Sequence, residues 1–232
     1  MKTNIRLWEK TYKWNKENKN YLVYPDEEVV RIVKKIFLPN GVKKVLDAGC
    51  GSGRHSLYML RENLKVFAID TSRTGLEITR ALAKESGHKI DLKQASIIKI
   101  PYSNDFFDAV LCWGIIHYLN PDEVDKAISE FYRVIKPGGY LILTLRSTID
   151  SEFKKDINKY DMSISDAPES KGMVFKYYNK DEIAPLLKGF KNLLYGHKTR
   201  TILGNLSRVI AHWFVVGEKN RVRSSNLTLR KY

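Results

Sequence analysis

Three glycines stand at every second position after a short apolar run: Gly49, Gly51 and Gly53 in VLDAGCGSGRHS, residues 45–56. Glycine has no Cβ, so a glycine loop after a buried strand allows the backbone to approach a bound ligand closely. Asp47 lies two residues before the first glycine, where its charge would repel a pyrophosphate. The sixth position counted from Gly49 is an arginine, so the dinucleotide pattern G-x-G-x-x-G is incomplete. The loop therefore predicts a site for a cofactor other than a dinucleotide.

A second carboxylate, Asp70, ends the apolar segment KVFAID, 21 residues after Gly49. A carboxylate at the end of such a strand can accept hydrogen bonds from both hydroxyls of a ribose. S-adenosylmethionine carries a sulfonium, an ammonium, a carboxylate and an adenosine but no phosphate, so it suits a glycine loop beside an aspartate. These residues predict S-adenosylmethionine as the cofactor.

The elements that must position these residues alternate along the chain. The sequence predicts helices over 24–38, 54–63, 74–87, 121–136 and 179–189, and strands over 43–49, 65–70, 89–96, 107–114 and 140–146. Strands that alternate with helices form a parallel sheet covered on both faces. Two further strands, over 190–199 and 208–219, are close enough in sequence to pair as a hairpin. Residues 147–176 are polar and poorly periodic, which predicts a long connection on the substrate side.

Four stretches resemble the class I S-adenosylmethionine-dependent methyltransferases: VLDAGCGSGRHS, VFAIDTS, IPYSNDFFDAVLCWGIIHYL and EFYRVIKPGGYLIL. They follow the family's order and spacing over residues 43–145, with a looser match to about residue 219. The resemblance implies an α/β fold, a Rossmann-like doubly wound sheet of seven strands in the order 3-2-1-4-5-7-6, with strand 7 antiparallel. It also implies an enzyme, a methyltransferase that moves the methyl group of S-adenosylmethionine by in-line displacement.

The resemblance implies that the glycine loop and the ends of the second, third and fourth strands bind the cofactor. The residues are Asp47, Gly49, Cys50, Gly51, Gly53, Asp70, Thr71, Ser96, Ile97, Cys112 and Trp113. Asp70 corresponds to the ribose anchor, and Thr71 lies next to the adenine. Ser96 departs from the family's pattern, which often has an aspartate there to accept the adenine amino group. A serine hydroxyl accepts that hydrogen bond more weakly.

On the acceptor side, His117 and Tyr118 follow the fourth strand and are expected to face the reaction cleft. A histidine there can contact the acceptor or take its proton, or it is a half-buried residue of a short helix. Trp8 and Tyr12 share a helix face within residues 1–30, which correspond to a lid over the cofactor in related enzymes. The alternative for this segment is an amphipathic helix packed on the edge of the sheet. No residue is assigned a catalytic role.

The composition indicates an ordinary globular protein. The 232 residues, 43% hydrophobic and 28% charged, fit a single domain, residues 1–232. No apolar run is long enough to span a membrane, and the N-terminal stretch lacks the apolar core of a signal peptide, so a cytoplasmic protein is expected. Cys50 and Cys112 belong to no CxxC or Cys/His cluster, which argues against a metal site and against a disulfide framework.

The formal net charge of +14 is concentrated at the two ends of the chain. Residues 1–45 carry 11 basic and 5 acidic side chains, residues 46–170 carry 16 and 18, and residues 171–232 carry 13 and 3. The last part includes a basic tail, residues 220–232. A basic surplus attracts nucleic acid, acidic membranes or anionic substrates, or it is a solvated lysine-rich surface.

The sequence favours a small-molecule methyl acceptor, because no RNA-binding domain is appended and the substrate-side connection is short. The basic ends leave open an RNA acceptor, for instance a modified tRNA base. A third alternative is a non-catalytic protein that binds the cofactor and activates a partner methyltransferase. The fourth strand is followed by CWGI rather than by an Asn/Asp-Pro-Pro-Tyr sequence, and no Pro-Cys nucleophile is present. Amino-methylation of nucleic-acid bases and cytosine-C5 methylation are therefore not expected.

Overall fold

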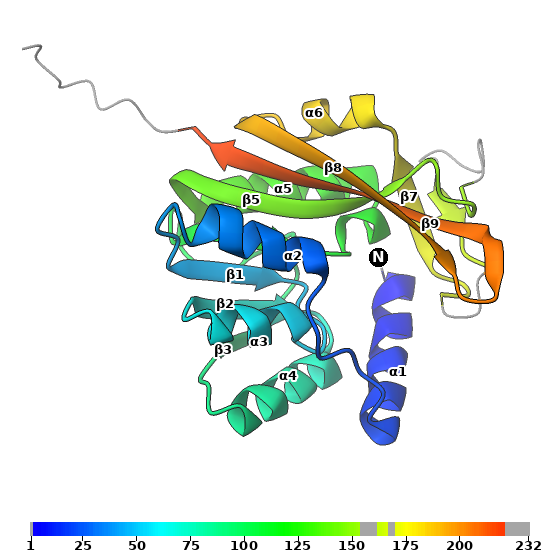
Figure 1. Ribbon diagram of the computed structural model, residues 1–232, viewed down its shortest axis with the longest axis horizontal. Helices are drawn as coiled ribbons and strands as arrows, with labels where there is room; N and C mark the ends of the chain where they lie inside the picture. The colour runs from blue at the N-terminus through cyan, green and yellow to red at the C-terminus, as the bar shows by residue number, and fades with distance from the viewer. Residues whose placement is uncertain (1, 154–161, 167–169, 221–232) are drawn as a thin grey trace, which may run out of the picture.

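A central sheet has the strand order that the sequence predicts (Figure 1). The computed structural model describes residues 2–153, 162–166 and 170–220. The order is β3–β2–β1–β4–β5–β9–β8. The strands are β1 (Lys44–Ala48), β2 (Lys65–Asp70), β3 (Asp91–Gln94), β4 (Phe107–Cys112), β5 (Ile135–Ser147), β8 (Phe190–Ile202) and β9 (Asn205–Lys219). Strands β1 to β5 pair in parallel and β9 is antiparallel to β5, so β8 and β9 are the sixth and seventh strands of the expected order.

The segment expected to be a long connection contains two further strands, β6 (Met162–Ile164) and β7 (Val174–Tyr178). The prediction of a seven-stranded sheet is wrong in this respect, because β7 pairs in parallel with the end of β5 and β6 pairs with β7. Phe175 and Tyr177 alternate along β7 and are buried. This period of two is only five residues long and is flanked by polar residues, so it gave little signal in the sequence.

Helices cover both faces of the sheet, because both faces of its parallel strands are apolar. Val45 on β1 packs in one cluster with side chains of the helices before and after that strand, whereas its neighbour Leu46 packs in the opposite cluster with the helix before β5. The helical elements of the described residues after the first are α2 (Glu27–Ile32), η1 (Val33–Phe37), α3 (Arg54–Arg61), α4 (Arg73–Glu85), η2 (Ile116–Tyr118), α5 (Pro121–Val134), η3 (Lys180–Glu182) and α6 (Ile183–Leu186).

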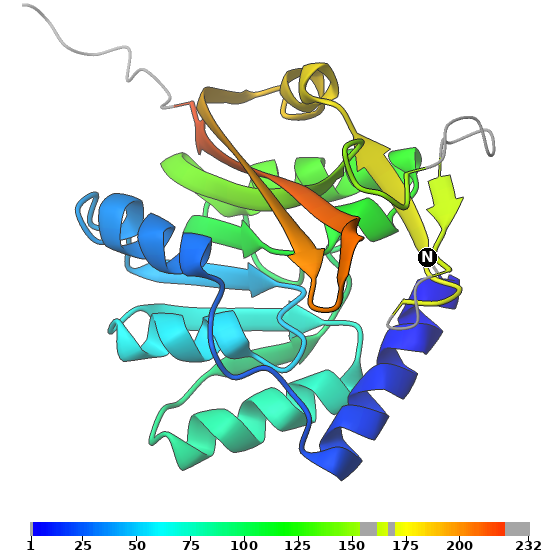
Figure 2. The same ribbon diagram turned by 45° about the vertical axis from the view of Figure 1, so that its right-hand side comes forward.

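The first helix, α1 (Lys2–Asn18), lies beyond the carboxyl ends of β1 and β2 and runs across them (Figure 2). The Asn4 side chain donates hydrogen bonds to the carbonyls of Tyr118 and Val174, at 3.1 and 3.0 Å, and accepts one from the Val174 amide. Farther along α1, Glu9 accepts hydrogen bonds of 2.6 Å from the hydroxyls of Ser72 and Thr74. The helix is therefore bound to both sides of the space that it covers.

The Glu9 contact gives a testable prediction for the docking of α1. We expect Glu9→Ala to weaken this docking by about 1–2 kcal/mol, since hydrogen bonds to a charged carboxylate contribute on this scale. Hydrogen–deuterium exchange at pH 7 should show faster exchange of the α1 amides. Glu17→Ala, an exposed change on the same helix, is the control and should leave exchange unchanged. Equal protection of α1 in both variants would contradict the prediction.

The same contact predicts a pH dependence. Burial raises the pKa of Glu9, but the hydrogen bonds from Ser72 and Thr74 outweigh this and hold the pKa below its ordinary value of 4.5. A carboxyl group whose pKa is lowered by folding stabilises the folded state above its ordinary pKa, and this contribution is lost as the pH falls through the lowered value. Limited proteolysis should therefore release α1 more readily below pH 4 than at pH 7, and Glu9→Ala should remove that difference.

Two predictions from the sequence are not tested by the described residues. The basic tail, residues 220–232, lies outside the described residues except for Asn220. The treatment of residues 1–232 as a single domain stays a prediction.

No helix among the described residues is long and apolar enough to cross a membrane.

Candidate cofactor and acceptor site

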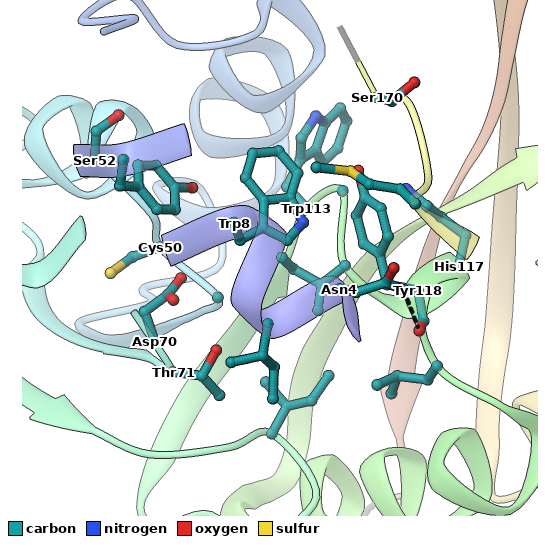
Figure 3. A pocket seen from close by; sticks show the side chains of 18 of the residues that line it. Asn4, Trp8, Cys50, Ser52, Asp70, Thr71, Trp113, His117, Tyr118 and Ser170 are labelled. Atoms are coloured by element: carbon teal, nitrogen blue, oxygen red, sulfur yellow. Dashed lines mark hydrogen bonds between the residues drawn. The ribbon is translucent and has the colours of Figure 1, made fainter. Parts of the chain in front are cut away.

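A cavity of about 490 Å³ lies at the carboxyl ends of the parallel strands, beneath α1 (Figure 3). Its volume is in the range of small-molecule binding sites. One end is lined by the loop after β1, the end of β2 and the segment after β3. The other end is lined by the segment after β4 together with side chains from α1, β5, β7, β8 and β9. The first end holds residues predicted to bind the cofactor and is called the cofactor end; the second holds residues predicted to bind the acceptor and is called the acceptor end.

Asp70 is fixed at the cofactor end by two backbone hydrogen bonds. Its carboxylate accepts one from the amide of Gly51 and one from the amide of Ser72, both 2.8 Å long. Burial raises the pKa of this carboxyl group, and the backbone hydrogen bonds oppose that rise. A carboxylate has about four lone-pair directions, so two oxygens held in this way can still accept hydrogen bonds from two hydroxyls of a ligand.

The glycine loop is held against β2 and α4 by its own backbone. The amides of Gly49 and Cys50 donate to the Ile69 carbonyl at 2.8 and 3.1 Å, and the Thr79 hydroxyl donates to the Gly51 carbonyl at 2.9 Å. Gly49 and Cys50 line the cavity. The loop thus presents backbone to the cavity at the position where the sequence predicts it.

Seven of the eleven residues predicted to bind the cofactor line the cavity: Gly49, Cys50, Asp70, Thr71, Ser96, Ile97 and Trp113. The other four, Asp47, Gly51, Gly53 and Cys112, do not line it. Gly53 adopts φ 84° as the N-cap of α3, and a Cβ there would clash with Thr79. Cys112 is fully buried within β4. The cofactor-binding role of all eleven residues stays a prediction.

Asp47 lies behind the loop. Its side chain is 1% exposed and accepts a 2.6 Å hydrogen bond from the Ser56 hydroxyl on α3. Burial raises the pKa of Asp47 to about 6, although the Ser56 hydrogen bond acts in the opposite direction. Asp47 therefore joins the end of β1 to the start of α3 and supports the loop from within the core.

Gly51 faces Tyr12 of α1, not the cavity directly. A Cβ on Gly51 would clash with the Tyr12 hydroxyl oxygen, and Gly51 has φ 55°, in the left-handed region. We expect Gly51→Ala to displace Tyr12 and to weaken S-adenosylmethionine binding by about tenfold, equivalent to about 1.4 kcal/mol. Isothermal titration measures this change, and Gly51→Ala/Tyr12→Phe should recover part of the affinity.

Gly87→Ala is the matched control for backbone strain. Gly87 has φ 74°, and a Cβ there would meet no atom within 4 Å. We expect this variant to lose about 1–2 kcal/mol of folding stability from strain alone and to keep the affinity of the parent protein. If Gly51→Ala/Tyr12→Phe binds no better than Gly51→Ala, the clash with Tyr12 is not the cause.

All four residues predicted for the acceptor side, Trp8, Tyr12, His117 and Tyr118, line the cavity. Trp8 stacks on Tyr12 and meets Tyr118 edge to face, each pair of ring centroids being 5.6 Å apart. His117 is 2% exposed, and its Nδ1 atom is buried without a hydrogen-bond partner among the described residues. Burial lowers the pKa of His117 well below 6.5, so its imidazole is neutral at pH 7. The acceptor role of these residues stays a prediction.

Four other residues line the cavity and are not among the predicted site residues: Arg54, Arg146, Arg200 and His212. Arg54 carries one signal in the sequence, because a cation at the first turn of a helix is unusual. Arg146 ends an apolar strand run, which was a second available signal. Arg200 and His212 lie on the hairpin β8–β9, far in sequence from the loop, and only the pairing of β9 with β5 brings them to the site.

The described residues contain no group of three His, Cys, Asp or Glu side chains that could hold a metal ion. The site lies at the carboxyl ends of β1 and β4, between which the strand order reverses, and this is where doubly wound sheets bind their ligands. A glycine loop after β1 and a buried carboxylate at the end of β2 define a Rossmann-like protein that binds an adenosine-type cofactor.

Comparison with known proteins supports one family. Residues 45–139 match a family model described as a methyltransferase domain. A ubiquinone biosynthesis O-methyltransferase of Rickettsia canadensis is 27% identical over 159 residues, which are 66% of this chain and 66% of that protein. A tRNA (carboxymethyluridine(34)-5-O)-methyltransferase of Arabidopsis thaliana is 34% identical over 110 residues, 47% of this chain and 25% of that protein. A SAM-dependent methyltransferase of Methanosarcina mazei has a similar structure, with a TM-score of 0.69 at 20% identity over 81% of this chain and 98% of that chain.

The family model, the relatives and the fold support a class I S-adenosylmethionine-dependent methyltransferase, with S-adenosylmethionine as the cofactor. The chain spans less than two thirds of the length of the two curated relatives. One of these relatives is named for ubiquinone biosynthesis and the other for tRNA, so the comparison leaves the acceptor to be argued from the site.

Proposed function

We propose that this chain transfers a methyl group from S-adenosylmethionine to a small-molecule acceptor held beneath α1. The observation that supports this most directly is the unpartnered, buried Nδ1 atom of His117 at the acceptor end of the cavity. A buried polar atom without a partner is unfavourable, and a bound acceptor with a hydroxyl or an amine would satisfy it.

The residues at the cofactor end fit S-adenosylmethionine. Asp70 has lone pairs left for the ribose hydroxyls after its two backbone hydrogen bonds. The Arg54 side chain lines the cavity and has no hydrogen-bond or ion-pair partner in the part of the chain that the structure describes. Its guanidinium suits the carboxylate of the methionine part. Bound S-adenosylmethionine supplies a methyl group on a sulfonium, an activated leaving group, so positioning provides much of the acceleration.

His117 can take the proton of the acceptor. Burial keeps its imidazole neutral at pH 7, and the free Nδ1 atom can accept a hydrogen bond from an acceptor hydroxyl and then its proton. Helix α1 excludes water from the same space, with Trp8 facing inward (Figure 3) and Tyr12 also lining the cavity. The chain's own residues thus orient the acceptor, accept its proton and exclude solvent.

The size of the cavity favours a small acceptor. About 490 Å³ has to hold both the cofactor and the acceptor group. Asn4 ties α1 to the backbone after β4 and to β7, so the acceptor end is covered as well as the cofactor end. A large acceptor would have to displace α1 or insert a single base beneath it.

An RNA acceptor is the second candidate, because one relative is named for tRNA and the hairpin β8–β9 is exposed. That hairpin carries Lys191 and Arg200 on its surface, and Leu203 and Leu206 near its tip are 102% and 80% exposed. Binding of single-stranded RNA usually uses aromatic side chains on which bases stack. The exposed tip has leucines instead, which supports the small-molecule acceptor.

The test is a tritiated-methyl transfer assay on a cell extract, separated into RNA, protein and small-molecule fractions. We expect the label in the small-molecule fraction. Label in RNA alone would replace the proposal with the RNA alternative. Binding of S-adenosylmethionine by isothermal titration without transfer to any fraction would favour a non-catalytic partner of another methyltransferase.

We also predict weak, salt-dependent tRNA binding. Basic residues that contact phosphates release counterions, so the affinity should be micromolar or weaker and should fall steeply between about 50 and 200 mM salt. A chain truncated after Asn220 should bind more weakly still, because it lacks the basic residues 221–232. Tight and tRNA-selective binding by the truncated chain would contradict the prediction.

A further inference from the structure

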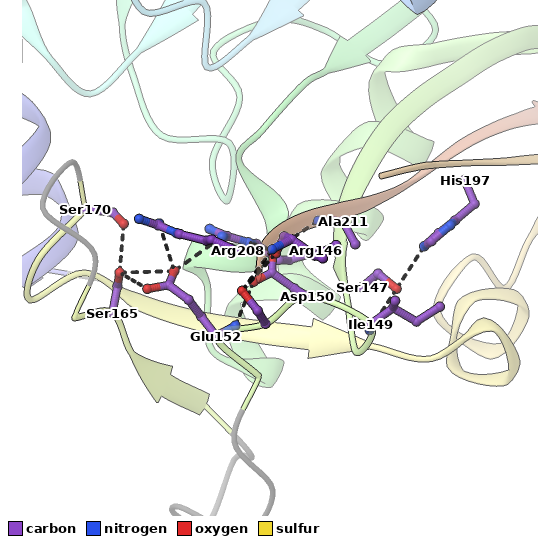
Figure 4. A network of polar contacts seen from close by, with 12 residues as sticks. Arg146, Ser147, Ile149, Asp150, Glu152, Ser165, Ser170, His197, Arg208 and Ala211 are labelled. Carbon is purple, nitrogen blue, oxygen red and sulfur yellow. Dashed lines mark hydrogen bonds and ion pairs between the residues drawn. The ribbon is translucent and has the colours of Figure 1, made fainter. Parts of the chain in front are cut away.

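Arg146 is a buried cation at the acceptor end of the cavity. Its side chain is 8% exposed and lines the cavity near the end of β5. The Nε atom lies 2.9 Å from a carboxylate oxygen of Asp150, and an Nη atom lies 3.4 Å from Glu152 (Figure 4). One edge of the guanidinium is thus fixed by two carboxylates that do not line the cavity.

The other edge of this guanidinium has donors to spare. A guanidinium has five N–H donors. The Nη1 atom of Arg146 makes no hydrogen bond to any described residue, and the group lies 4.5 Å from the ring centroid of Phe175, another lining residue. The carboxylates hold Arg146 in one orientation, so its free donors are positioned before a ligand arrives.

A second guanidinium, that of Arg200, lies at the acceptor end of the cavity. Arg200 on β8 lines the cavity, is exposed at its mouth and has no hydrogen-bond or ion-pair partner within the described part of the chain. Asp150 and Glu152 balance the charges of Arg146 and Arg208, the latter 3.7 Å from Glu152. The charge of Arg200 is not balanced in this way.

Among the described residues, the acceptor end has no carboxylate of its own. Asp70 is the one acidic residue among the described residues that line the cavity, and it belongs to the cofactor end. His117 and His212 are both neutral at pH 7, since burial lowers the pKa of each, that of His212 to about 4. The acceptor end therefore offers free cationic donors and neutral imidazoles, a combination that recognises an anionic oxygen group.

We propose that the methyl acceptor carries an acidic oxygen group, which binds the free donors of Arg146 and the unpaired Arg200, while the group to be methylated lies at His117. The acidic group is a carboxylate or a phosphate ester, both of which present oxygens to a guanidinium. The rings of Trp8, Tyr118 and Phe175 form apolar walls for the part of the acceptor between these two groups. This inference rests on the proposed small-molecule transferase function.

The test uses probes on protein saturated with S-adenosylhomocysteine, whose binding is confirmed first by isothermal titration. The probes are 4-hydroxybenzoate, 4-hydroxyphenyl phosphate and the neutral 4-hydroxybenzamide, and binding is measured by ligand-observed NMR. We expect one of the anionic probes to bind about tenfold or more tightly than the amide, the scale of one charge-assisted hydrogen bond. The two anionic probes distinguish a carboxylate from a phosphate ester.

Two variants and one control test whether the preference for the anionic probe depends on Arg146 and Arg200. Arg200→Gln is an exposed change and should reduce the preference for the anionic probe by about threefold to tenfold. Arg146→Gln/Asp150→Asn removes both charges together, leaves no lone buried charge and should abolish the preference. Lys191→Gln removes a charge from β8 outside the cavity and should leave the preference unchanged.

The outcomes of these experiments distinguish a failure of this inference from a failure of the proposed function. Equal or tighter binding of the amide, no binding of either anionic probe, or an unchanged preference in Arg146→Gln/Asp150→Asn would overturn the inference. The proposed function stands in those cases if tritium is transferred to a neutral small molecule in the extract. Transfer to RNA alone would overturn the proposed function, whatever the probes show.

Discussion

Replacement of His117 by alanine is expected to lower kcat by about 10²–10⁴-fold, the usual contribution of a positioned general base. The reason is that His117 lines the cavity, its Nδ1 atom is buried without a partner among the described residues, and we propose it as the proton acceptor. The affinity for S-adenosylmethionine should change little, since His117 lies at the opposite end. Tritium transfer to the small-molecule fraction measures the rate, and isothermal titration measures the affinity.

The pH profile distinguishes proton transfer from a packing role of His117. Burial lowers the pKa of His117 well below 6.5, so the neutral form persists from pH 7 down to well below 6.5. The rate of the parent enzyme should therefore be flat near neutrality and fall only at lower pH, as the imidazole gains a proton. His117→Ala should lose this fall, and added imidazole should restore part of its rate. His88→Ala, outside the cavity, is the control. A small loss in His117→Ala with an unchanged pH profile would show that His117 only packs.

Asp70→Asn is expected to weaken S-adenosylmethionine binding by about 1–3 kcal/mol, or roughly tenfold to a hundredfold. The Gly51 amide donates to one carboxylate oxygen and the Ser72 amide to the other, so asparagine keeps only one of these two hydrogen bonds. It also loses the charge and the second acceptor oxygen that we propose for the ribose. The fold should persist, because burial already raises the pKa of Asp70 and a neutral amide avoids the desolvation of the carboxylate.

The matched control is Asp125→Asn on the exposed side of α5, which removes the same charge away from the cavity. Isothermal titration of both variants, with thermal unfolding to confirm the fold, tests the assignment. Affinity in Asp70→Asn equal to that of the control would remove Asp70 from the ribose site. It would also question the register in which β2 ends beside the loop after β1.

The sequence by itself determined the main strands of this protein and the site residues that directly follow them. Gly49 and Asp70 are positioned by the strands that immediately precede them, and a strand that ends in a loop leaves its signal in a few consecutive residues. The same local patterns predicted a parallel sheet and the hairpin β8–β9, and the family resemblance implied the order of the strands. Together with the family resemblance, they identified the cofactor, and they pointed to His117 and Tyr118 after β4.

Only the tertiary structure decided which residues share the cavity. Asp47 and Gly53 belong to the glycine motif, yet neither lines the cavity. Asp47 is buried and bonded to Ser56, and Gly53 is the N-cap of α3, packed against Thr79. Tyr12 meets Gly51 although 38 intervening residues separate them in the sequence. Arg146, Arg200 and His212 come together because β9 pairs with β5 and β8 pairs with β9. Contacts between distant segments follow from how the elements pack, and a local pattern of residue types does not encode them.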